Sequence, residues 1–235
     1  MPNPFFTFKQ FTIHHDRCAM KVGTDGVLLG AWVNLNHSHR ILDIGTGTGL
    51  IALMMAQRCN DCNITAIDID SEAVSQANEN IQASPWKEKV VAIQQDIRSF
   101  HPDVYFDTIV SNPPYFINSL KSSDTQRNTA RHTDTLSAEE LMQKTADLLT
   151  ENGYFSIILP TEQIEELILI SERVGLYPSR RTHVITRPGL MPKRTLMEFC
   201  KRKTSFLTDE LVIELDRHVY SKEYIALTRD FYLKM

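Results

Sequence analysis

The sequence predicts an α/β fold built on a mainly parallel sheet. From residue 40 onward, short apolar runs of strand length alternate with longer amphipathic runs of helical period. This alternation is typical of βαβ units with right-handed crossovers, which place helices on both faces of a sheet. After Gly175 the rhythm changes, and three strand-like runs follow with no helix between them. We therefore expect an antiparallel edge at the C-terminal side of the sheet.

The expected elements follow from apolar periodicity and from capping signals. Strands are expected over residues 41–44, 63–67, 90–93, 108–110 and 154–159, and later over 183–186, 195–200 and 211–215. Helices are expected over 50–58, from 71 to about 83, from 137 to about 149, from 160 to about 174 and over 222–234. Ser71 is a natural N-cap, Ser137 with Glu140 resembles a capping box, and Asn152-Gly153 is expected to end the third helix.

Length and composition favour a single domain spanning residues 1–235, with residues 1–39 as an N-terminal extension and 176–235 as the antiparallel strands and closing helix. The chain is 42% hydrophobic and 23% charged, an ordinary globular balance. Four cysteines make no disulfide framework, and the Cys59–Cys62 pair lacks the further ligands of a zinc site, so we expect no metal. No signal peptide or membrane-spanning run is present, which predicts a soluble cytoplasmic protein without a membrane partner.

Charge is unevenly distributed along the chain. Between Leu176 and Ser205, eight Lys and Arg residues face one acid, Glu198, so this segment carries +7. The whole chain carries −4, which leaves −11 for the remainder. The segment either forms a local patch for an anionic partner or is a solvated face.

A glycine loop and three acids lie where a nucleotide-like cofactor would bind. Gly45, Gly47 and Gly49 follow the first parallel strand, and Asp43 precedes them within it. Asp68 ends the second strand, where an acid can accept hydrogen bonds from ribose hydroxyls. Asp96 ends the third, where an acid can accept from an adenine amine. A dinucleotide dehydrogenase shares some of these features, but its glycines fall as GxGxxG and these fall as GxGxG.

Together these residues resemble the S-adenosylmethionine pocket of class I methyltransferases. The resemblance implies a Rossmann-like, mainly parallel seven-stranded sheet with an antiparallel C-terminal edge. It places Asp43 and the loop near the amino-acid part of the cofactor, Asp68 near the ribose and Asp96 near the adenine. The full set of expected cofactor contacts is Thr24, Asp25, Asp43, Gly45, Thr46, Gly47, Gly49, Asp68, Ile69, Asp96, Ile97 and Asn112. Taken alone, each Asp is more often a helix cap or a turn residue than a cofactor contact.

The segment Asn112-Pro113-Pro114-Tyr115 follows the fourth strand and is the candidate catalytic loop. The two prolines stiffen it, and the Asn112 amide oxygen and Pro113 carbonyl can accept both hydrogens of a planar amine. These acceptors stabilise the nitrogen as it becomes positive in the transition state, while Tyr115 can stack on the ring. The motif resembles that of amino-methyltransferases acting on adenine N6, guanine N2 or protein glutamine.

Three further segments narrow the resemblance to the bacterial valine-tRNA adenine-N6 methyltransferase family. They are residues 20–32, residues 187–194 and residues 221–232. The resemblance implies methylation of adenine 37 in the anticodon stem-loop, with Thr24 and Asp25 covering the cofactor, although residues 22–32 could be only a packing helix. The expected RNA contacts are Arg127, Arg131, His132, Lys193 and Arg194.

Three alternatives stay open from the sequence. A protein-glutamine N5-methyltransferase acting on release factors would carry a sizeable helical domain before the glycine loop, and only about 40 residues stand there. An rRNA guanine-N2 methyltransferase shares the catalytic motif. A module that binds RNA or cofactor without catalysis is disfavoured, because the acceptors that the chemistry needs are present.

Overall fold

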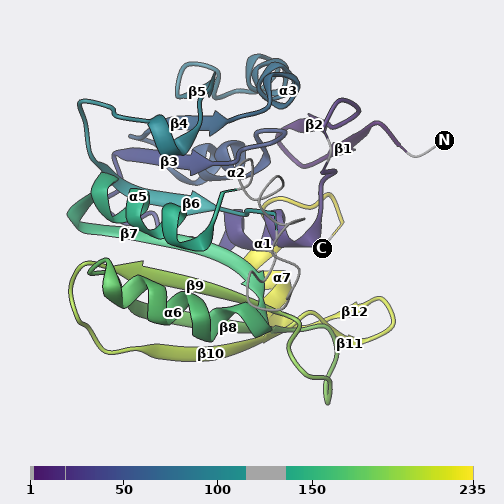
Figure 1. The fold of residues 1–235 in the computed structure, drawn as a ribbon. Coiled ribbons are helices and arrows are strands. Elements are labelled where there is room, and N and C mark those ends of the chain that lie inside the picture. Colours follow the sequence, from purple (N-terminus) through teal and green to yellow (C-terminus); the bar gives the residue numbers. More distant parts are fainter. Residues whose placement is uncertain (1–2, 19, 115–135, 235) are drawn as a thin grey trace, which may run out of the picture.

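A computed structural model describes residues 3–18, 20–114 and 136–234 of the chain. Its centre is an eight-stranded sheet (Figure 1). The strands are β3 (Arg40–Ile44), β4 (Asn63–Asp68), β5 (Val90–Gln94), β6 (Phe106–Ser111), β7 (Leu149–Pro160), β8 (Tyr177–Ile185), β9 (Arg194–Cys200) and β10 (Leu207–Val212). Their order is β10-β8-β9-β7-β6-β3-β4-β5, and the five strands from β7 to β5 run parallel. The predicted α/β class is therefore confirmed.

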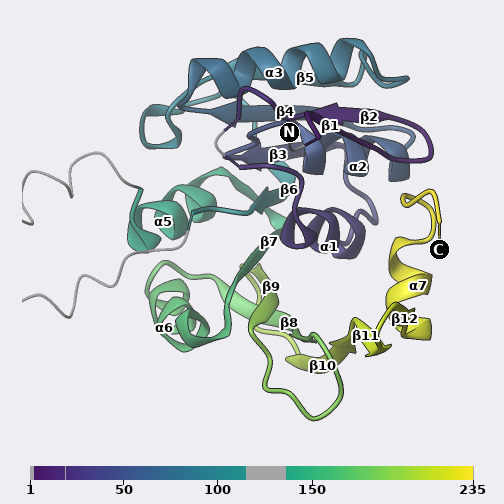
Figure 2. The ribbon, with the colours of Figure 1, turned by 90° about the vertical axis from the view of Figure 1, so that its right-hand side faces the viewer.

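Helices cover both faces of this sheet, as the alternation of strands and helices predicted (Figure 2). They are α1 (Thr24–Trp32), α2 (Leu50–Arg58), α3 (Ser71–Gln82), α5 (Ala138–Leu148), α6 (Ile164–Arg173) and α7 (Lys222–Thr228), with short 3-10 turns η1 (Ile97–Ser99) and η2 (Thr161–Gln163). Side chains of α1, α2 and α3 belong to one apolar core, and those of α5 and α6 to a second. Within the described residues, no helix is long and apolar enough to cross a membrane.

The C-terminal edge of the sheet is partly as expected. β9 pairs antiparallel with both β7 and β8, which confirms the antiparallel edge. β10 instead pairs parallel with β8, so the sheet has eight strands and not seven. The reason is topological: the chain reverses after β9, and β8 already occupies the neighbouring position. β10 must therefore bind the far side of β8 and shares its direction.

Local differences from the expected elements have identifiable causes. β7 begins at Leu149, so Gly153 lies inside a strand and does not follow a helix. A Cβ at this position would lie 2.9 Å from the Asp107 carbonyl oxygen, so the glycine permits close approach to β6. The N-cap of α3 is Asp70, whose side chain accepts from the Glu72 N–H at 2.9 Å, and not Ser71. The capping box of Ser137 and Glu140 is confirmed.

The two ends of the chain pack together beside α1, which the sequence did not indicate. Two small hairpins, β1 (Phe5–Thr7) with β2 (Thr12–His14) and β11 (Glu214–Asp216) with β12 (Val219–Tyr220), flank the main sheet. The Lys9 N–H donates to the Phe231 carbonyl at 2.8 Å, and Phe8 stacks on Tyr232 at 5.9 Å between ring centroids. α7 ends at Thr228 because the chain turns back there and buries Phe231 in the core.

Candidate active site

A cavity of about 1180 Å³ opens at the carboxyl ends of the parallel strands. Its walls come from the start of α1, the loop after β3, the ends of β4, β5 and β6, and the first turns of α5 and α6. Ten of the twelve expected cofactor residues line it, and the other two, Asp43 and Gly49, lie behind the lining. Ligands bind in this position in open α/β sheets. The cavity exceeds the roughly 300–1,000 Å³ that one small molecule occupies.

The loop after β3 has a backbone that only glycine adopts readily. Gly45, Gly47 and Gly49 have φ values of 71°, 55° and 80°. A Cβ on Gly45 or Gly47 would meet nothing within 4 Å, so these two glycines provide backbone conformation and leave open space above the loop. Gly49 serves packing as well, because its Cβ would lie 3.4 Å from the Ala77 side chain of α3.

Asp43 is a buried carboxyl group beneath this loop. The Thr46 hydroxyl donates to its Oδ2 at 2.7 Å, while its Oδ1 is buried with no hydrogen-bond partner. Burial raises the pKa of Asp43 to about 7, against the opposing effect of the Thr46 hydroxyl. A buried carboxylate oxygen without a hydrogen-bond partner would be stabilised by a positive charge nearby. The ammonium group of a free amino-acid moiety carries such a charge.

Asp68 is fixed at the end of β4 by the backbone around it. Its Oδ2 accepts from the Gly47 N–H at 2.8 Å, and its Oδ1 accepts from the Asp70 N–H at 3.0 Å. Both oxygens retain lone pairs toward the cavity, so the carboxylate can also accept from two neighbouring hydroxyl groups. The side chain of Ile69 beside it is 58% exposed, an apolar surface on which a planar ring can lie.

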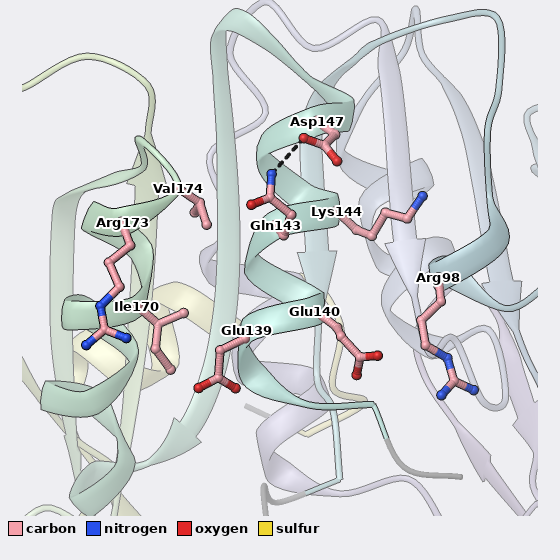
Figure 3. Close-up of a pocket in the computed structure, with 9 residues that line it drawn as sticks. All are labelled: Arg98, Glu139, Glu140, Gln143, Lys144, Asp147, Ile170, Arg173 and Val174. Atoms are coloured by element: carbon pink, nitrogen blue, oxygen red, sulfur yellow. Dashed lines mark hydrogen bonds between the residues drawn. The ribbon is translucent and has the colours of Figure 1, made fainter. Parts of the chain in front are cut away.

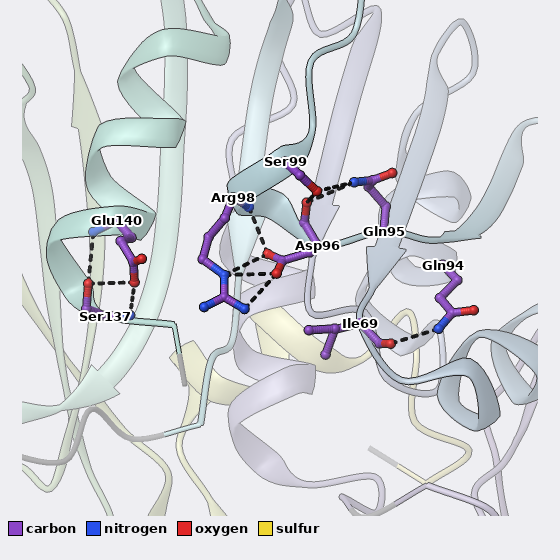
Figure 4. A network of polar contacts seen from close by, with 8 residues as sticks. All are labelled: Ile69, Gln94, Gln95, Asp96, Arg98, Ser99, Ser137 and Glu140. Atoms are coloured by element: carbon purple, nitrogen blue, oxygen red, sulfur yellow. Dashed lines mark hydrogen bonds and ion pairs between the residues drawn. The ribbon is translucent and has the colours of Figure 1, made fainter. Parts of the chain in front are cut away.

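Asp96 is held by a residue that the sequence analysis missed (Figure 4). The Arg98 guanidinium donates to Asp96 through Nε at 2.9 and 3.1 Å and through Nη2 at 2.7 Å, and the Arg98 N–H adds a bond of 2.9 Å. These hydrogen bonds lower the pKa of Asp96, which keeps the carboxylate ionised. The signal for this pair was the Asp-x-Arg spacing at a strand end.

A smaller groove of about 450 Å³ adjoins the cavity between α5 and α6 (Figure 3). Arg98, Glu139 and Ile170 line both. The groove walls carry charges of both signs, and Gln143 donates to Asp147 at 2.9 Å across one turn of α5. Of the predicted cofactor, substrate and RNA contacts that the structure describes, none lines this groove.

The candidate catalytic loop begins on the cavity wall. Asn112, Pro113 and Pro114 line the cavity, and Tyr115 lies outside the described residues. Ser111, the last residue of β6, donates to the Ile44 carbonyl at 2.9 Å, which fixes the loop beside the end of β3. Within the described chain, no hydrogen bond engages the Asn112 amide, so its oxygen is available to a substrate.

Cys18 and residues 20–26 close the cavity from the N-terminal side. Cys18, Met20 and Lys21 line it together with the start of α1. The segment before them is held to α3 by Asn80, whose Nδ2 donates to the carbonyls of His14 and Thr48 and whose Oδ1 accepts from the His14 N–H, all at 2.9 Å. One buried amide thus joins the N-terminal hairpin to the glycine loop.

The basic segment does not form the single patch that its composition suggested. The cations near the turn between β8 and β9 and those that follow β9 are separated by the length of that strand, roughly 20 Å. Five of its eight cations pair with carboxylates from elsewhere or across the sheet: Arg180 with Glu198, Arg181 with Glu165, Arg187 with Glu214, Arg194 with Asp25 and Lys201 with Glu151. Of the expected RNA contacts, Arg127, Arg131 and His132 lie outside the described residues. Lys193 is exposed at the active-site edge, and Arg194 contacts α1.

Comparison with known proteins agrees with this geometry. The Methyltransferase small domain family matches residues 19–175. A solved structure of a predicted O-methyltransferase from Agrobacterium tumefaciens shares the fold, with a TM-score of 0.69 at 20% identity over 88% of this chain and 96% of that one. The fold and the site therefore define a class I methyltransferase.

Full-length relatives identify the family within that class. The chain is 55% identical to the tRNA1(Val) (adenine(37)-N6)-methyltransferase of Phocaeicola vulgatus over the whole of both proteins. It is 47% identical to the protein of the same name from Flavobacterium psychrophilum, over 98% of this chain and all of that one. The chain belongs to the tRNA1(Val) (adenine(37)-N6)-methyltransferase family, which confirms the resemblance seen in its motifs.

Proposed function

We propose that this protein transfers a methyl group from S-adenosylmethionine to N6 of adenine 37 in a valine tRNA of the cytoplasmic pool. The position of Asn112 carries this proposal. Its amide lies at the end of β6, in the same cavity as the glycine loop, with no partner among the described residues. The names of the full-length relatives support adenine over guanine or glutamine as the target.

The site residues fit the cofactor by their chemistry. The partnerless Oδ1 of Asp43 suits an ammonium group nearby, and Asp68 suits ribose hydroxyls. The ionised Asp96 suits the adenine amine, and the apolar side chain of Ile69 suits the ring face. When bound, S-adenosylmethionine supplies an electrophilic methyl group on a sulfonium leaving group. These contacts would place the reacting end toward Asn112.

The role of the catalytic loop is electrostatic and positional. The Asn112 side-chain oxygen and the Pro113 carbonyl accept the two N6 hydrogens and stabilise the nitrogen as it gains positive charge. Because the leaving group is good, no strong base is needed, and alignment supplies much of the rate. Tyr115 would stack on the adenine, which must leave the stack of the anticodon loop to enter a cavity of this size.

The reaction can be tested with labelled S-adenosylmethionine and three acceptors: a valine tRNA transcript, the same transcript with guanine at position 37, and a release factor. We expect label only in the first transcript, recovered as N6-methyladenosine by mass spectrometry. Label in the release factor and none in tRNA would overturn the proposal.

The role of Asn112 has its own test. Asn112→Ala should lower the single-turnover rate by about 10²- to 10³-fold, because one transition-state acceptor is lost. Asn112 is also one of the expected cofactor contacts, but its main role is toward the amine, so affinity for S-adenosylhomocysteine should fall far less than the rate, by about twofold. A loss of cofactor affinity with an unchanged rate at saturation would show that Asn112 has another role.

A further inference from the structure

The loop between β8 and β9 exposes two neighbouring large apolar side chains to solvent. We define the hairpin tip as residues 187–193. Met191 is 83% exposed, the most exposed large apolar side chain among the described residues, and Leu190 beside it is 52% exposed. Single exposed apolar side chains are ordinary on protein surfaces, whereas neighbouring ones that form a patch are typical of contact sites.

The hairpin tip is supported and does not hang as a loose loop. The Leu190 N–H donates to the Arg187 carbonyl at 3.2 Å, and Gly189 between them has a φ of 80°. The Arg187 guanidinium binds Glu214 Oε2 at 3.0 and 3.3 Å. At its other end, the Lys193 carbonyl accepts from the Thr161 N–H at 3.2 Å. A surface held in this way loses little conformational entropy on binding.

The hairpin tip adjoins the active-site cavity. Arg194, the next residue, donates from Nε to Asp25 Oδ2 at 2.8 Å, and Asp25 lines the cavity. Thr161 begins η2, whose last residue, Gln163, also lines the cavity. Figure 1 shows the loop extending from the side of the sheet on which β3 and β4 end.

The charges of the hairpin tip indicate whether it would contact duplex or single-stranded RNA. Arg187 and the adjoining Arg194 are paired with carboxylates, while Lys193 is exposed and has no ion pair in the described part of the chain. A duplex stem would call for many unpaired cations along its phosphates. Aliphatic side chains such as Leu and Met can insert between bases, and a lysine beside them can bind a single phosphate. Unstacked bases are accessible in single-stranded loops.

We infer that Leu190 and Met191 form a docking surface for anticodon-loop nucleotides that flank the target adenine, with Lys193 on a neighbouring phosphate. The inference rests on the proposed function and extends it. The two apolar side chains would hold the loop open while the target adenine enters the cavity. Arg194 holds the end of the hairpin tip to α1 through its ion pair with Asp25, and in this arrangement it does not itself contact RNA.

The test compares the Leu190→Ala/Met191→Ala double variant with Leu169→Ala, which removes a side chain of similar exposure (59%) on α6. We expect the double variant to raise the KM for tRNA about tenfold, the loss expected when buried apolar contact is removed. Single-turnover rate at saturating tRNA and affinity for S-adenosylhomocysteine should not change. The Leu169→Ala control should behave as wild type.

Salt dependence separates the two kinds of contact. Lys193→Ala should reduce the salt slope of tRNA binding by about 0.7 to 1, whereas the double variant should leave the slope unchanged. Met191→Gln, of similar length and polar, should reproduce most of the loss with the fold intact.

Two outcomes overturn the inference. Wild-type tRNA affinity in the double variant would show that the hairpin tip does not dock RNA. Weaker binding of S-adenosylhomocysteine in that variant would show that it acts through Arg194 and Asp25 on the cofactor side. If wild-type protein itself methylates no tRNA, the proposed function fails instead, so the two failures are distinct.

Discussion

Asp43 should make the stability of the apo protein fall as pH rises, because its carboxyl group is fully buried with one oxygen lacking a partner. Burial raises its pKa from 3.8 to about 7, and the hydrogen bond from Thr46 opposes this only in part. The folded state therefore binds the proton more tightly than the unfolded state. The resulting stabilisation is fully present below pH 3.8 and is lost as pH rises through about 7.

The magnitude follows from the two pKa values. Three units of difference correspond to roughly 4 kcal/mol over the whole range. Between about pH 5 and about pH 8, the linkage relation gives a loss of about 2.5 kcal/mol from this one group. An Asp43→Asn variant lacks the titration. Its free energy of unfolding should therefore rise relative to wild type by this amount across the same interval.

Urea unfolding of both proteins at several pH values measures this difference and cancels the other titrating groups. A difference in unfolding free energy that stays constant from about pH 5 to about pH 8 would refute the reasoning. Cofactor binding offers a second readout. An ammonium group placed near Asp43 should drive off its proton, so calorimetry in buffers of different ionisation enthalpy should show release of up to about half a proton at pH 7. Asp43→Asn should show none.

Three other substitutions test positioning and packing. Asn80→Ala leaves the buried Thr48 carbonyl and two part-buried backbone groups of His14 without this partner, so it should destabilise the protein by about 2–4 kcal/mol and speed amide exchange over residues 12–17. Unchanged exchange there would show that Asn80 does not hold the hairpin to the glycine loop. Gly153→Ala should cost about 1–3 kcal/mol in urea unfolding, because its Cβ would press on the Asp107 carbonyl; wild-type stability would contradict this close contact. Arg98→Met should weaken binding of S-adenosylhomocysteine but not of its inosine analogue, which lacks the amine that Asp96 accepts from. An equal loss of affinity for both ligands would show that Arg98 has only a structural role.

The sequence predicted those parts of the fold that depend on local pattern. Buried parallel strands are continuous apolar runs, and a left-handed loop requires glycine, so β3 and the loop at Gly45 to Gly49 could be located in advance. The three acids could be placed because each lies at or near the end of a parallel strand, and such ends meet at one edge of the sheet.

Contacts between distant segments could not be predicted in this way. The ion pair of Arg194 with Asp25 joins residues 169 positions apart, and nothing in either local sequence announces it. For this reason, the +7 charge of the basic segment overestimated the number of cations that are free to bind an anionic partner. Likewise, three-residue strands such as β1 have too few positions to show a period. Gly153 was taken for a helix end because a glycine needed for close packing has the same local pattern.

The contact between the first hairpin and residues 231–232 has a consequence for synthesis on the ribosome. Phe8 and Lys9 meet Phe231 and Tyr232, which are translated long after them. The parallel strands can begin to pair while the chain is still emerging, because N-terminal units fold first during synthesis. These contacts can hold the hairpin only once residues 231 and 232 have also emerged. The wall of the cofactor cavity that follows the hairpin, residues 20–26, is therefore completed after the parallel sheet, and a nascent chain would acquire its full cofactor affinity only when this contact has formed.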